Sequence, residues 1–435
     1  MSSVATVENS EARASRFAIR EFMKLESAGG VCLLTATIIA LVLANSPLGD
    51  IAADFWHHHA VVLVGPVEID ESLVHWINDG AMAIFFFVAG LEIKRELVVG
   101  ELRDARRAAL PAFAALGGMV MPAALYLLIN AGGDGSGGWG IPLATDIAFA
   151  VALLAVVGRR LPSGLKVFLL SLAIADDIGA VLVIAIFYSS TISFTWLGIV
   201  GGLIALVMLM KRADIWFVPA YVVVGSAMWV AMLESGVHAT LAGVVLGLMA
   251  PAVARKPDPT VVEVEPTMPL GVLREVLTDA RETIPVTDRL LHILHPWTAF
   301  VILPVFALAN GGVVLSADGV IDAATSPITL GIVLGLVGGK FIGIVLATRL
   351  AVGLGIGSLP EGVTWRMVSG VALLGGIGFT VSLFITGLAF DDHVLRDQAK
   401  IGVLTASVIA AVAGAILLRR EAVALETELE MTKTG

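Results

Sequence analysis

The chain has 435 residues, of which 57% are hydrophobic and only 15% are charged, and its formal net charge is −10. Soluble domains carry roughly 25% charged residues, so this composition excludes an ordinary soluble domain and indicates that lipid surrounds most of the chain. Cys32 is the only cysteine, which excludes intrachain disulfides and zinc or iron–sulfur sites built from cysteines.

The apolar runs of the sequence predict an all-α membrane protein. A membrane-spanning helix needs about 20 apolar residues, and about twelve such runs occur between residues 28 and 418. This spanning domain, 28–418, is predicted to lie between a cytoplasmic N-terminal segment, 1–27, and a cytoplasmic tail, 419–435. In chain order the predicted spans are 28–44, 73–91, 108–130, 139–157, 163–188, 194–210, 216–233, 237–250, 295–310, 329–352, 368–390 and 401–418.

The basic residues support this topology. Lys and Arg gather in the cytoplasmic loops of membrane proteins, and here all but three of the 27 fall on one side of the predicted spans. The exceptions are Arg396 and Lys400 on the other side, and Lys340 inside a span. Both termini are therefore predicted to be cytoplasmic. Residues 61–69 predict a small β-hairpin on the outer side, and residues 251–288 predict a long cytoplasmic loop.

Four ionisable residues lie deep in the predicted spans: Asp146, Asp176, Asp177 and Lys340. A charged side chain costs roughly 2.5–3.5 kcal/mol at the centre of a bilayer. Four of them would cost on the order of 10 kcal/mol, which is comparable with the net stability of a whole protein. The sequence therefore predicts a functional site at this depth, with an inert network of buried ion pairs as the alternative.

The charges of this group predict a site that exchanges cations. Three carboxylates and one ammonium leave a surplus of negative charge when all are ionised, and the apolar surroundings oppose that state. Protons or a bound hard cation can cancel the surplus, because carboxylate oxygens are natural ligands of hard cations. Asp176 and Asp177 diverge by about 100° on a helix. One of them can therefore face an ion cavity while the other meets Lys340.

Two of the predicted spans are interrupted. The fourth contains Gly140 and Pro142 shortly before Asp146, and the eleventh contains glycines at 375, 376 and 378. Each is the middle span of a group of three, and the two groups enter the membrane from opposite sides, as in an inverted-topology repeat. Broken helices leave their dipole ends inside the membrane. Asp146 is predicted to offset positive N-termini there, and Lys340 to offset negative C-termini.

Several motifs of this chain resemble those of the NhaA-type sodium/proton antiporters. They occur in the order of that family and cover almost the whole spanning domain. The motifs are WIND at 76–79, GLEIKREL at 90–97, ATDIAFA at 144–150, ADDIGA at 175–180, SGVHAT at 235–240, LHPW at 294–297 and GIGFT at 376–380.

The resemblance implies a particular fold and transport cycle. It implies twelve helices, of which the fourth and eleventh are broken and cross each other, with Asp146, Thr145, Gly376 and Gly378 supporting the crossing. It also implies electrogenic exchange of intracellular Na⁺ or Li⁺ for external H⁺, with two protons per sodium, without a cofactor or an enzymatic reaction. The implied ion-binding and proton-carrying residues are Asp177 as the principal ligand, Asp176 beside it, and Lys340, which bridges to Asp176 when sodium is absent.

Further implications concern regulation, location and assembly. The resemblance assigns a cytoplasmic funnel and a response to alkaline pH to Glu92, Arg95, Glu96, His292 and His295. His238 is placed in the same group, with a packing or hydrogen-bonding role as its alternative. The family pattern has an acidic residue directly before His292, whereas this chain has Leu291. The family also implies the inner membrane of bacteria, a role in sodium and pH homeostasis, and a homodimer formed through the outer hairpin. No nucleic-acid partner is predicted.

Other classes of function remain as alternatives. A sodium-coupled symporter of related fold agrees with the same charges, although two aspartates with a lysine favour proton exchange. A cation channel needs a continuous pore, which interrupted helices and Lys340 do not favour. An intramembrane aspartyl protease needs two carboxylates that converge from separate helices, whereas Asp176 and Asp177 are neighbours on one helix.

Overall fold

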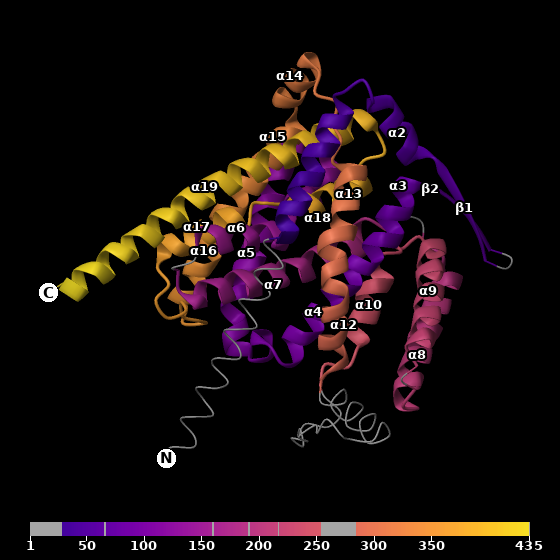
Figure 1. The fold of residues 1–435 in the computed structure, drawn as a ribbon, viewed down its shortest axis with the longest axis horizontal. Helices are drawn as coiled ribbons and strands as arrows, with labels where there is room; N and C mark the ends of the chain where they lie inside the picture. Colours follow the sequence, from indigo (N-terminus) through magenta and orange to yellow (C-terminus); the bar gives the residue numbers. More distant parts are fainter. Residues whose placement is uncertain are drawn as a thin grey trace, which may run out of the picture. The chain divides into compact units, whose positions relative to one another are not determined.

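The computed structural model describes residues 28–64, 67–158, 161–189, 192–215, 217–253 and 284–434 (Figure 1). This part of the chain is mostly helical and contains one two-stranded sheet. The predicted N-terminal segment, the hairpin turn at 65–66 and most of the predicted loop at 251–288 lie outside the described residues.

Eight helices of the described chain are long and apolar enough to cross a membrane, so the protein is a multi-pass membrane protein. They are Leu73–Val98, Ala105–Asn130 (α5), Ser163–Phe187 (α7), Phe194–Arg212 (α8), Val218–Ser235 (α9), Val286–Asn310, Pro327–Gly353, and His393–Thr427, which belongs to α19 (His393–Thr434). Three of these spans contain a π-helical segment between two α-helices. Their parts are α3 (Leu73–His75), η1 (Trp76–Ala81) and α4 (Met82–Val98); α12 (Val286–Trp297), η4 (Thr298–Ile302) and α13 (Leu303–Asn310); and α15 (Pro327–Val333), η5 (Leu334–Gly339) and α16 (Lys340–Gly353).

Three pairs of helices would each form one more span, but each pair bends by more than 40° at a short break. The helix Ala28–Ala44 and α2 (Gly49–His57) meet at 113°. The two pairs that contain the predicted interruptions bend less: η3 (Asp134–Leu143) with α6 (Ile147–Val157) at 44°, and α17 (Trp365–Leu374) with α18 (Phe379–Ala389) at 46°. Counting each pair as one span gives up to eleven spans in the described residues.

The remaining predicted span, 237–250, is a short helix in the structure. It contains α10 (Leu241–Met249), whose nine residues are too few to cross a bilayer by themselves. Three short helices of the described chain lie outside the predicted spans and were not predicted: α2, the 3₁₀ helix η2 (Glu101–Arg103) and α14 (Ala317–Thr325). The sequence prediction of about twelve full spans therefore exceeds what the described helices support by length and composition.

The predicted hairpin is present and is longer than expected. Strands β1 (His59–Val64) and β2 (Val67–Ser72) pair in antiparallel fashion, with Val64 opposite Val67 and His59 opposite Ser72. β-Branched residues such as Val61, Val62 and Ile69 favour an extended strand because their branched side chains restrict χ1 and suit a pleated surface.

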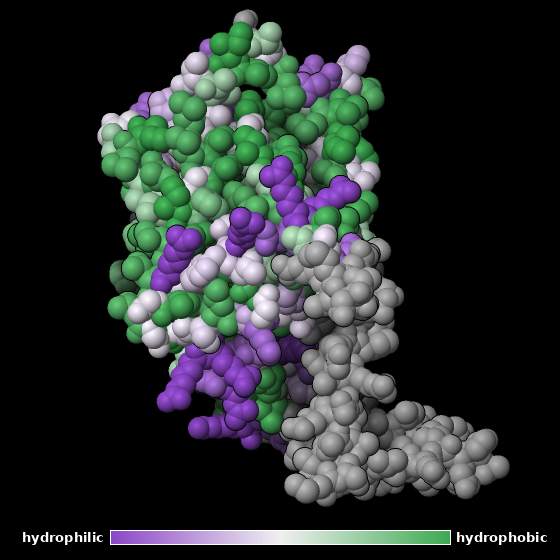
Figure 2. All heavy atoms as spheres, turned by 90° about the vertical axis from the view of Figure 1, so that its left-hand side faces the viewer, coloured by the Kyte–Doolittle hydropathy of each residue, from purple (hydrophilic) through white to green (hydrophobic). Residues whose placement is uncertain are grey.

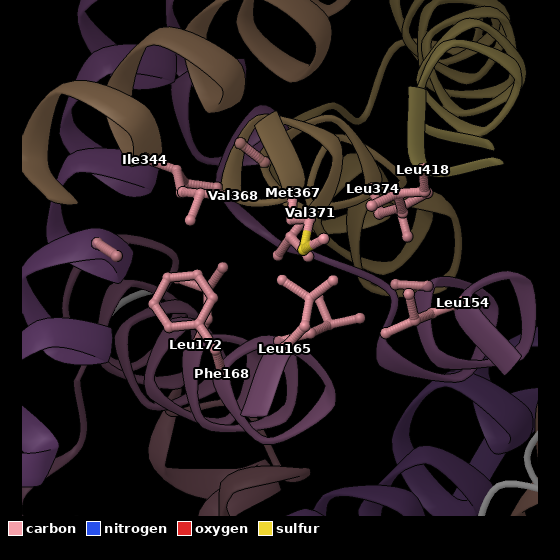
Figure 3. Close-up of a cluster of buried hydrophobic side chains, with 14 of the residues drawn as sticks. Leu154, Leu165, Phe168, Leu172, Ile344, Met367, Val368, Val371, Leu374 and Leu418 are labelled. Atoms are coloured by element: carbon pink, nitrogen blue, oxygen red, sulfur yellow. The ribbon is translucent and has the colours of Figure 1, made fainter. Parts of the chain in front are cut away.

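The chain divides into two compact units. The first unit contains Met1–Asn78, Ala109–Tyr188 and Ala299–Gly435, and the second contains Asp79–Ala108 and Ser189–Thr298. The core of the first unit is a cluster of buried aliphatic and aromatic side chains, drawn in Figure 3. Its labelled residues come from α6, α7, α16, α17 and α19, and they include Leu154, Leu165, Phe168, Ile344, Val371 and Leu418.

Large apolar side chains are also exposed, in stripes along single helices. On α16 the exposed residues are Ile342, Leu346 and Leu350, and on α19 they include Val412 and Ile416. Figure 2 shows one face of the molecule, on which hydrophobic side chains cover most of the upper part and hydrophilic side chains gather lower in the view. Residues spaced by three or four positions lie on one helix face, so these stripes are surfaces suited to lipid.

Helices α5 and α16 cross at a point where neither carries a side chain. A Cβ atom built on Gly343 would collide with the carbonyl oxygen of Gly117, and one built on Gly339 would lie 2.7 Å from Cα of Pro122. Small residues let helix backbones approach closely in membranes. Because Gly339 and Gly343 flank Lys340 along the chain, this crossing fixes the helix that carries the buried lysine.

We expect Gly343→Ala to destabilise the protein, because the new methyl group must push α16 away from α5. Overpacking of this kind costs about 1–3 kcal/mol, which a lower midpoint of thermal unfolding in detergent would report. Gly338→Ala is the matched control, since a Cβ at Gly338 meets nothing within 4 Å. Equal midpoints for the two variants would contradict the proposed close packing.

Candidate functional site

A buried ion pair joins α7 and α16 within the first unit. Lys340 Nζ lies 2.5 Å from Asp176 Oδ2, and the two side chains are 1% and 2% exposed. A charge that has been removed from water needs an opposite charge beside it, which explains why these residues meet. The second oxygen of Asp176, Oδ1, is buried and has no hydrogen-bond partner among the described residues.

Asp177 follows directly on the same helix and is half-buried. Consecutive residues of an α-helix point about 100° apart, so Asp177 does not share the direction of Asp176. Both residues lie near the middle of α7, far from either end of a 25-residue helix. Among the described residues, no three His, Cys, Asp or Glu side chains gather closely enough to hold a metal ion by themselves. A cation bound by the two aspartates would therefore need further oxygen ligands.

Thr145 connects the ion pair to the bent helix pair formed by α17 and α18. Lys340 Nζ donates to Thr145 Oγ1 at 3.1 Å, and Thr145 Oγ1 donates to the carbonyl oxygen of Gly375 at 2.8 Å. Gly375 is the C-cap of α17, so its carbonyl lies at the negative end of that helix. The sequence predicted that Lys340 would offset such a C-terminus. In the structure the Thr145 hydroxyl bonds to this carbonyl instead, because Lys340 is drawn to the carboxylate of Asp176.

Asp146 lies where two helices begin, as the sequence predicted. It is the N-cap of α6, and its Oδ1 accepts a hydrogen bond from the backbone amide of Phe149 at 3.1 Å. Its Oδ2 accepts from the amide of Thr380 at 3.1 Å and from the Thr380 hydroxyl at 2.7 Å, near the start of α18. A helix N-terminus carries roughly half a positive charge. Two such ends therefore balance the carboxylate of Asp146.

The breaks of the two helix pairs touch each other. The backbone amide of Asp146 donates to the carbonyl of Ile377 at 2.6 Å. A Cβ atom on Gly376 would collide with the carbonyl of Leu336, and one on Gly378 would lie 3.2 Å from the carbonyl of Ala144. Gly376 therefore stands where a neighbouring backbone leaves no room for a side chain, and at Gly378 the Ser382 hydroxyl occupies that space.

Four of the residues predicted for the pH response make polar contacts within the second unit. His295 Nε2 lies 3.4 Å from Glu92 Oε1, and Arg95 Nε lies 3.2 Å from Asp288 Oδ1. Glu96 Oε2 accepts a hydrogen bond from the amide of Glu101 at 3.1 Å, which satisfies a free amide at the start of η2. The structure thus brings α4 and α12 together through charged side chains.

The other two histidines of this group lie on or next to two different helices. His292 is exposed on α12, and His238 is half-buried just before α10, where its carbonyl accepts from the amide of Leu241. Leu291, which replaces the acidic residue of the family pattern, is buried against Val88 and Leu91 of α4. A carboxylate at this position would lie among apolar side chains, so the packing explains why leucine stands here.

Sequence reasoning missed Thr380, an uncharged partner of Asp146. Thr380 makes two hydrogen bonds to that carboxylate, one from its amide and one from its hydroxyl group. A threonine in an apolar span carries no charge penalty, and a single residue has no periodicity. The one available signal was the position of Thr380 in the GIGFT motif, two residues after the break.

Comparisons with known proteins identify relatives of the chain over most of its length. A family model described as Na⁺/H⁺ antiporter 1 matches residues 20–418. The chain is 45% identical over 409 residues to the Na(+)/H(+) antiporter NhaA 3 of Frankia alni, which covers 92% of this chain and 88% of the relative. It is 46% identical to the Na(+)/H(+) antiporter NhaA of Shewanella loihica, over 91% of this chain and 95% of the relative, and 46% identical to that of Rhodopirellula baltica, over 91% and 92%.

Proposed function

The chain belongs to the Na⁺/H⁺ antiporter 1 family, and we propose that it expels one intracellular Na⁺ or Li⁺ for every two H⁺ that enter. The single observation that carries this proposal is the group of Asp176, Asp177 and Lys340, buried or half-buried in the middle of their spans. Charged groups at this depth are costly and mark ion pathways or proton relays.

The charges of the three residues fit a site with two alternative occupants. With all three ionised the group carries one net negative charge, since Asp146 is already balanced by two helix N-termini. A monovalent cation or a proton can neutralise it. Because the oxygens of two carboxylates cannot hold Na⁺ and both protons together, the two kinds of ligand compete.

The transport cycle follows from this competition. When the site faces the cytoplasm, Asp176 and Asp177 release two protons, and Asp177, assisted by Asp176, binds Na⁺. The helices then move so that the site opens to the outside, and two external protons displace the Na⁺. When neither ion is bound as cargo, the Asp176 carboxylate pairs with Lys340. One positive charge enters per cycle, so the exchange is electrogenic and can be driven by the proton gradient.

Regulation and assembly are further parts of the proposal. Glu92, Arg95 and Glu96 on α4, with His292 and His295 on α12 and His238 before α10, would line the cytoplasmic funnel and set the pH response. The contacts of His295 with Glu92 and of Arg95 with Asp288 support a role as a group. We further propose an inner-membrane location with cytoplasmic termini and twelve membrane crossings, one of which includes α10. Helices α5–α7 and α15–α19 would form an inverted repeat. Two copies of the chain would form a homodimer through β1 and β2.

Competition between Na⁺ and protons can be measured on the purified protein. Adding Na⁺ in weak buffer should release protons, which a pH-sensitive dye detects. In liposomes, the KM for Na⁺ should fall as the pH rises, by about tenfold per pH unit for each proton that competes for the site. Sodium binding without release of protons, at any pH, would exclude exchange and leave sodium-coupled symport as the better explanation.

A further inference from the structure

The segment before Thr145 has a conformation that rarely persists by itself. Helix η3 (Asp134–Leu143) is a 3₁₀ helix of ten residues. Its hydrogen bonds have poorer geometry than those of an α-helix, and 3₁₀ runs longer than three or four residues are uncommon. Something outside the segment must therefore stabilise it.

Hydroxyl groups from three different helices bond to the backbone of η3, all within the first unit. Tyr126 of α5 donates to the carbonyl of Gly135 at 2.6 Å, and Ser382 of α18 donates to the carbonyl of Ile141 at 2.7 Å. Between them, Tyr188 donates to the carbonyl of Gly137 and accepts from the amide of Gly140, both at 2.9 Å. The contacts are spread over the length of the segment.

Tyr188 makes the most specific of these contacts. Gly137 and Gly140 are three residues apart, which is the spacing that a 3₁₀ helix joins, and one hydroxyl group bonds to both. The approach requires glycine, because a Cβ on Gly140 would lie 2.7 Å from Cε2 of the Tyr188 ring. The ring also stacks on Trp139, with centroids 6.4 Å apart.

Tyr188 is also the C-cap of α7, the helix that carries both site aspartates. Helix η3 ends at Leu143, two residues before Thr145. The Thr145 hydroxyl accepts a hydrogen bond from Lys340 Nζ and donates one to the carbonyl of Gly375. The Tyr188 hydroxyl therefore connects the end of the aspartate helix to the segment that places Thr145 beside the lysine.

We propose that Tyr188, supported by Tyr126, is a positioning residue that sets how readily Na⁺ displaces Lys340 from Asp176. The proposal rests on the exchange function proposed above. With the Tyr188 hydrogen bonds intact, the Lys340 ammonium donates both to Thr145 Oγ1 and to the carboxylate of Asp176. Without them, η3 relaxes and Thr145 moves, so Lys340 pairs with Asp176 alone and competes more strongly with the cation.

The chain has only three tyrosines, which provides a matched set of variants. Tyr188→Phe keeps the ring but removes both hydrogen bonds, and Tyr126→Phe removes one. Tyr221→Phe is the control, because its hydroxyl also donates to a backbone carbonyl, that of Ile215 at 2.9 Å, but in the second unit. Each variant is measured by hydrogen–deuterium exchange of peptides covering 137–146 and by Na⁺-driven exchange in liposomes.

We expect Tyr188→Phe to speed deuterium uptake in 137–146 and to raise the KM for Na⁺ by about five- to tenfold, the effect of about one net hydrogen bond. The maximal rate should change by less than about twofold, since the ion ligands themselves remain. Tyr126→Phe should change both quantities in the same direction by a smaller factor, and Tyr221→Phe should behave like the wild type.

Two outcomes would overturn the proposal. Unchanged deuterium uptake in Tyr188→Phe and Tyr126→Phe would show that the hydroxyls do not hold η3, and faster uptake with an unchanged KM would show that η3 does not set the site. Should Tyr188→Phe not fold, the same criteria apply to Tyr126→Phe. Wild-type protein without Na⁺-driven exchange would instead reject the proposed function, while deuterium uptake would still report whether the tyrosines hold the segment.

Discussion

Asp177→Asn is expected to abolish sodium-dependent proton flux in proteoliposomes. The amide has nearly the shape of the carboxylate but can neither release a proton nor offer a negative charge to a cation. Losing one member of a buried charge interaction costs roughly 2–5 kcal/mol. A loss of this size raises the KM for Na⁺ by about 30-fold or more, and the missing proton carrier should reduce even the maximal rate to background.

The control for this variant is Asp54→Asn, which makes the same chemical change at an exposed position of α2. It should leave the flux unchanged. The folding of Asp177→Asn can be checked by its thermal midpoint, which should not fall, because an amide is less costly than a carboxylate in an apolar span. Robust exchange by a folded Asp177→Asn protein would remove this residue as the proposed ligand.

Lys340→Met should both destabilise the protein and stop exchange. Removing one partner of a buried ion pair costs about 3–5 kcal/mol, because the other charge is left without compensation. Here the uncompensated group is Asp176, which is 2% exposed. We expect a clear fall in the thermal midpoint in detergent and no sodium-dependent proton flux, since the carboxylate then holds a proton more firmly than the cycle allows.

The double variant Asp176→Asn with Lys340→Met separates these two effects. Replacing both charges of a buried pair is often neutral for stability, so the thermal midpoint should recover toward the wild-type value while exchange stays absent. The coupling free energy from this double-mutant cycle measures the pair directly. Additive losses of stability in the double variant would contradict a strong interaction between the two side chains.

The charged part of the site could be foreseen because charge in an apolar span is conspicuous. Asp146, Asp176, Asp177 and Lys340 each interrupt a hydrophobic run, and the cost of burying them indicates that they need partners. Helix geometry then separates the directions of Asp176 and Asp177, so that one of them can meet Lys340, and the family resemblance implies that this one is Asp176. The ion pair and the two helix N-termini at Asp146 follow from the same electrostatic argument.

Most of the neutral part of the site could not be foreseen. Thr145 was expected only from the family resemblance. Tyr188 bonds to backbone groups, which have no signature in the sequence, and the Thr380 hydroxyl bonds to the carboxylate of Asp146, which lies far away along the chain. The length of a short helix could not be foreseen either. The run 237–250 is apolar enough to be predicted as a span, but its helix begins only at Leu241, after Gly236, which has a positive φ of 79°.

The carboxylate of Asp146 has a consequence for how the protein can move. It accepts hydrogen bonds from the start of α6 and from the start of α18 at once. A motion that separated α6 from α18 would leave the Asp146 carboxylate next to only one helix N-terminus. It would also leave the Thr380 amide without a hydrogen-bond partner inside the membrane, at a cost of several kcal/mol. In the proposed transport cycle, the two bent helix pairs should therefore move as one rigid body, and the surfaces that slide past each other should lie around this body rather than through it.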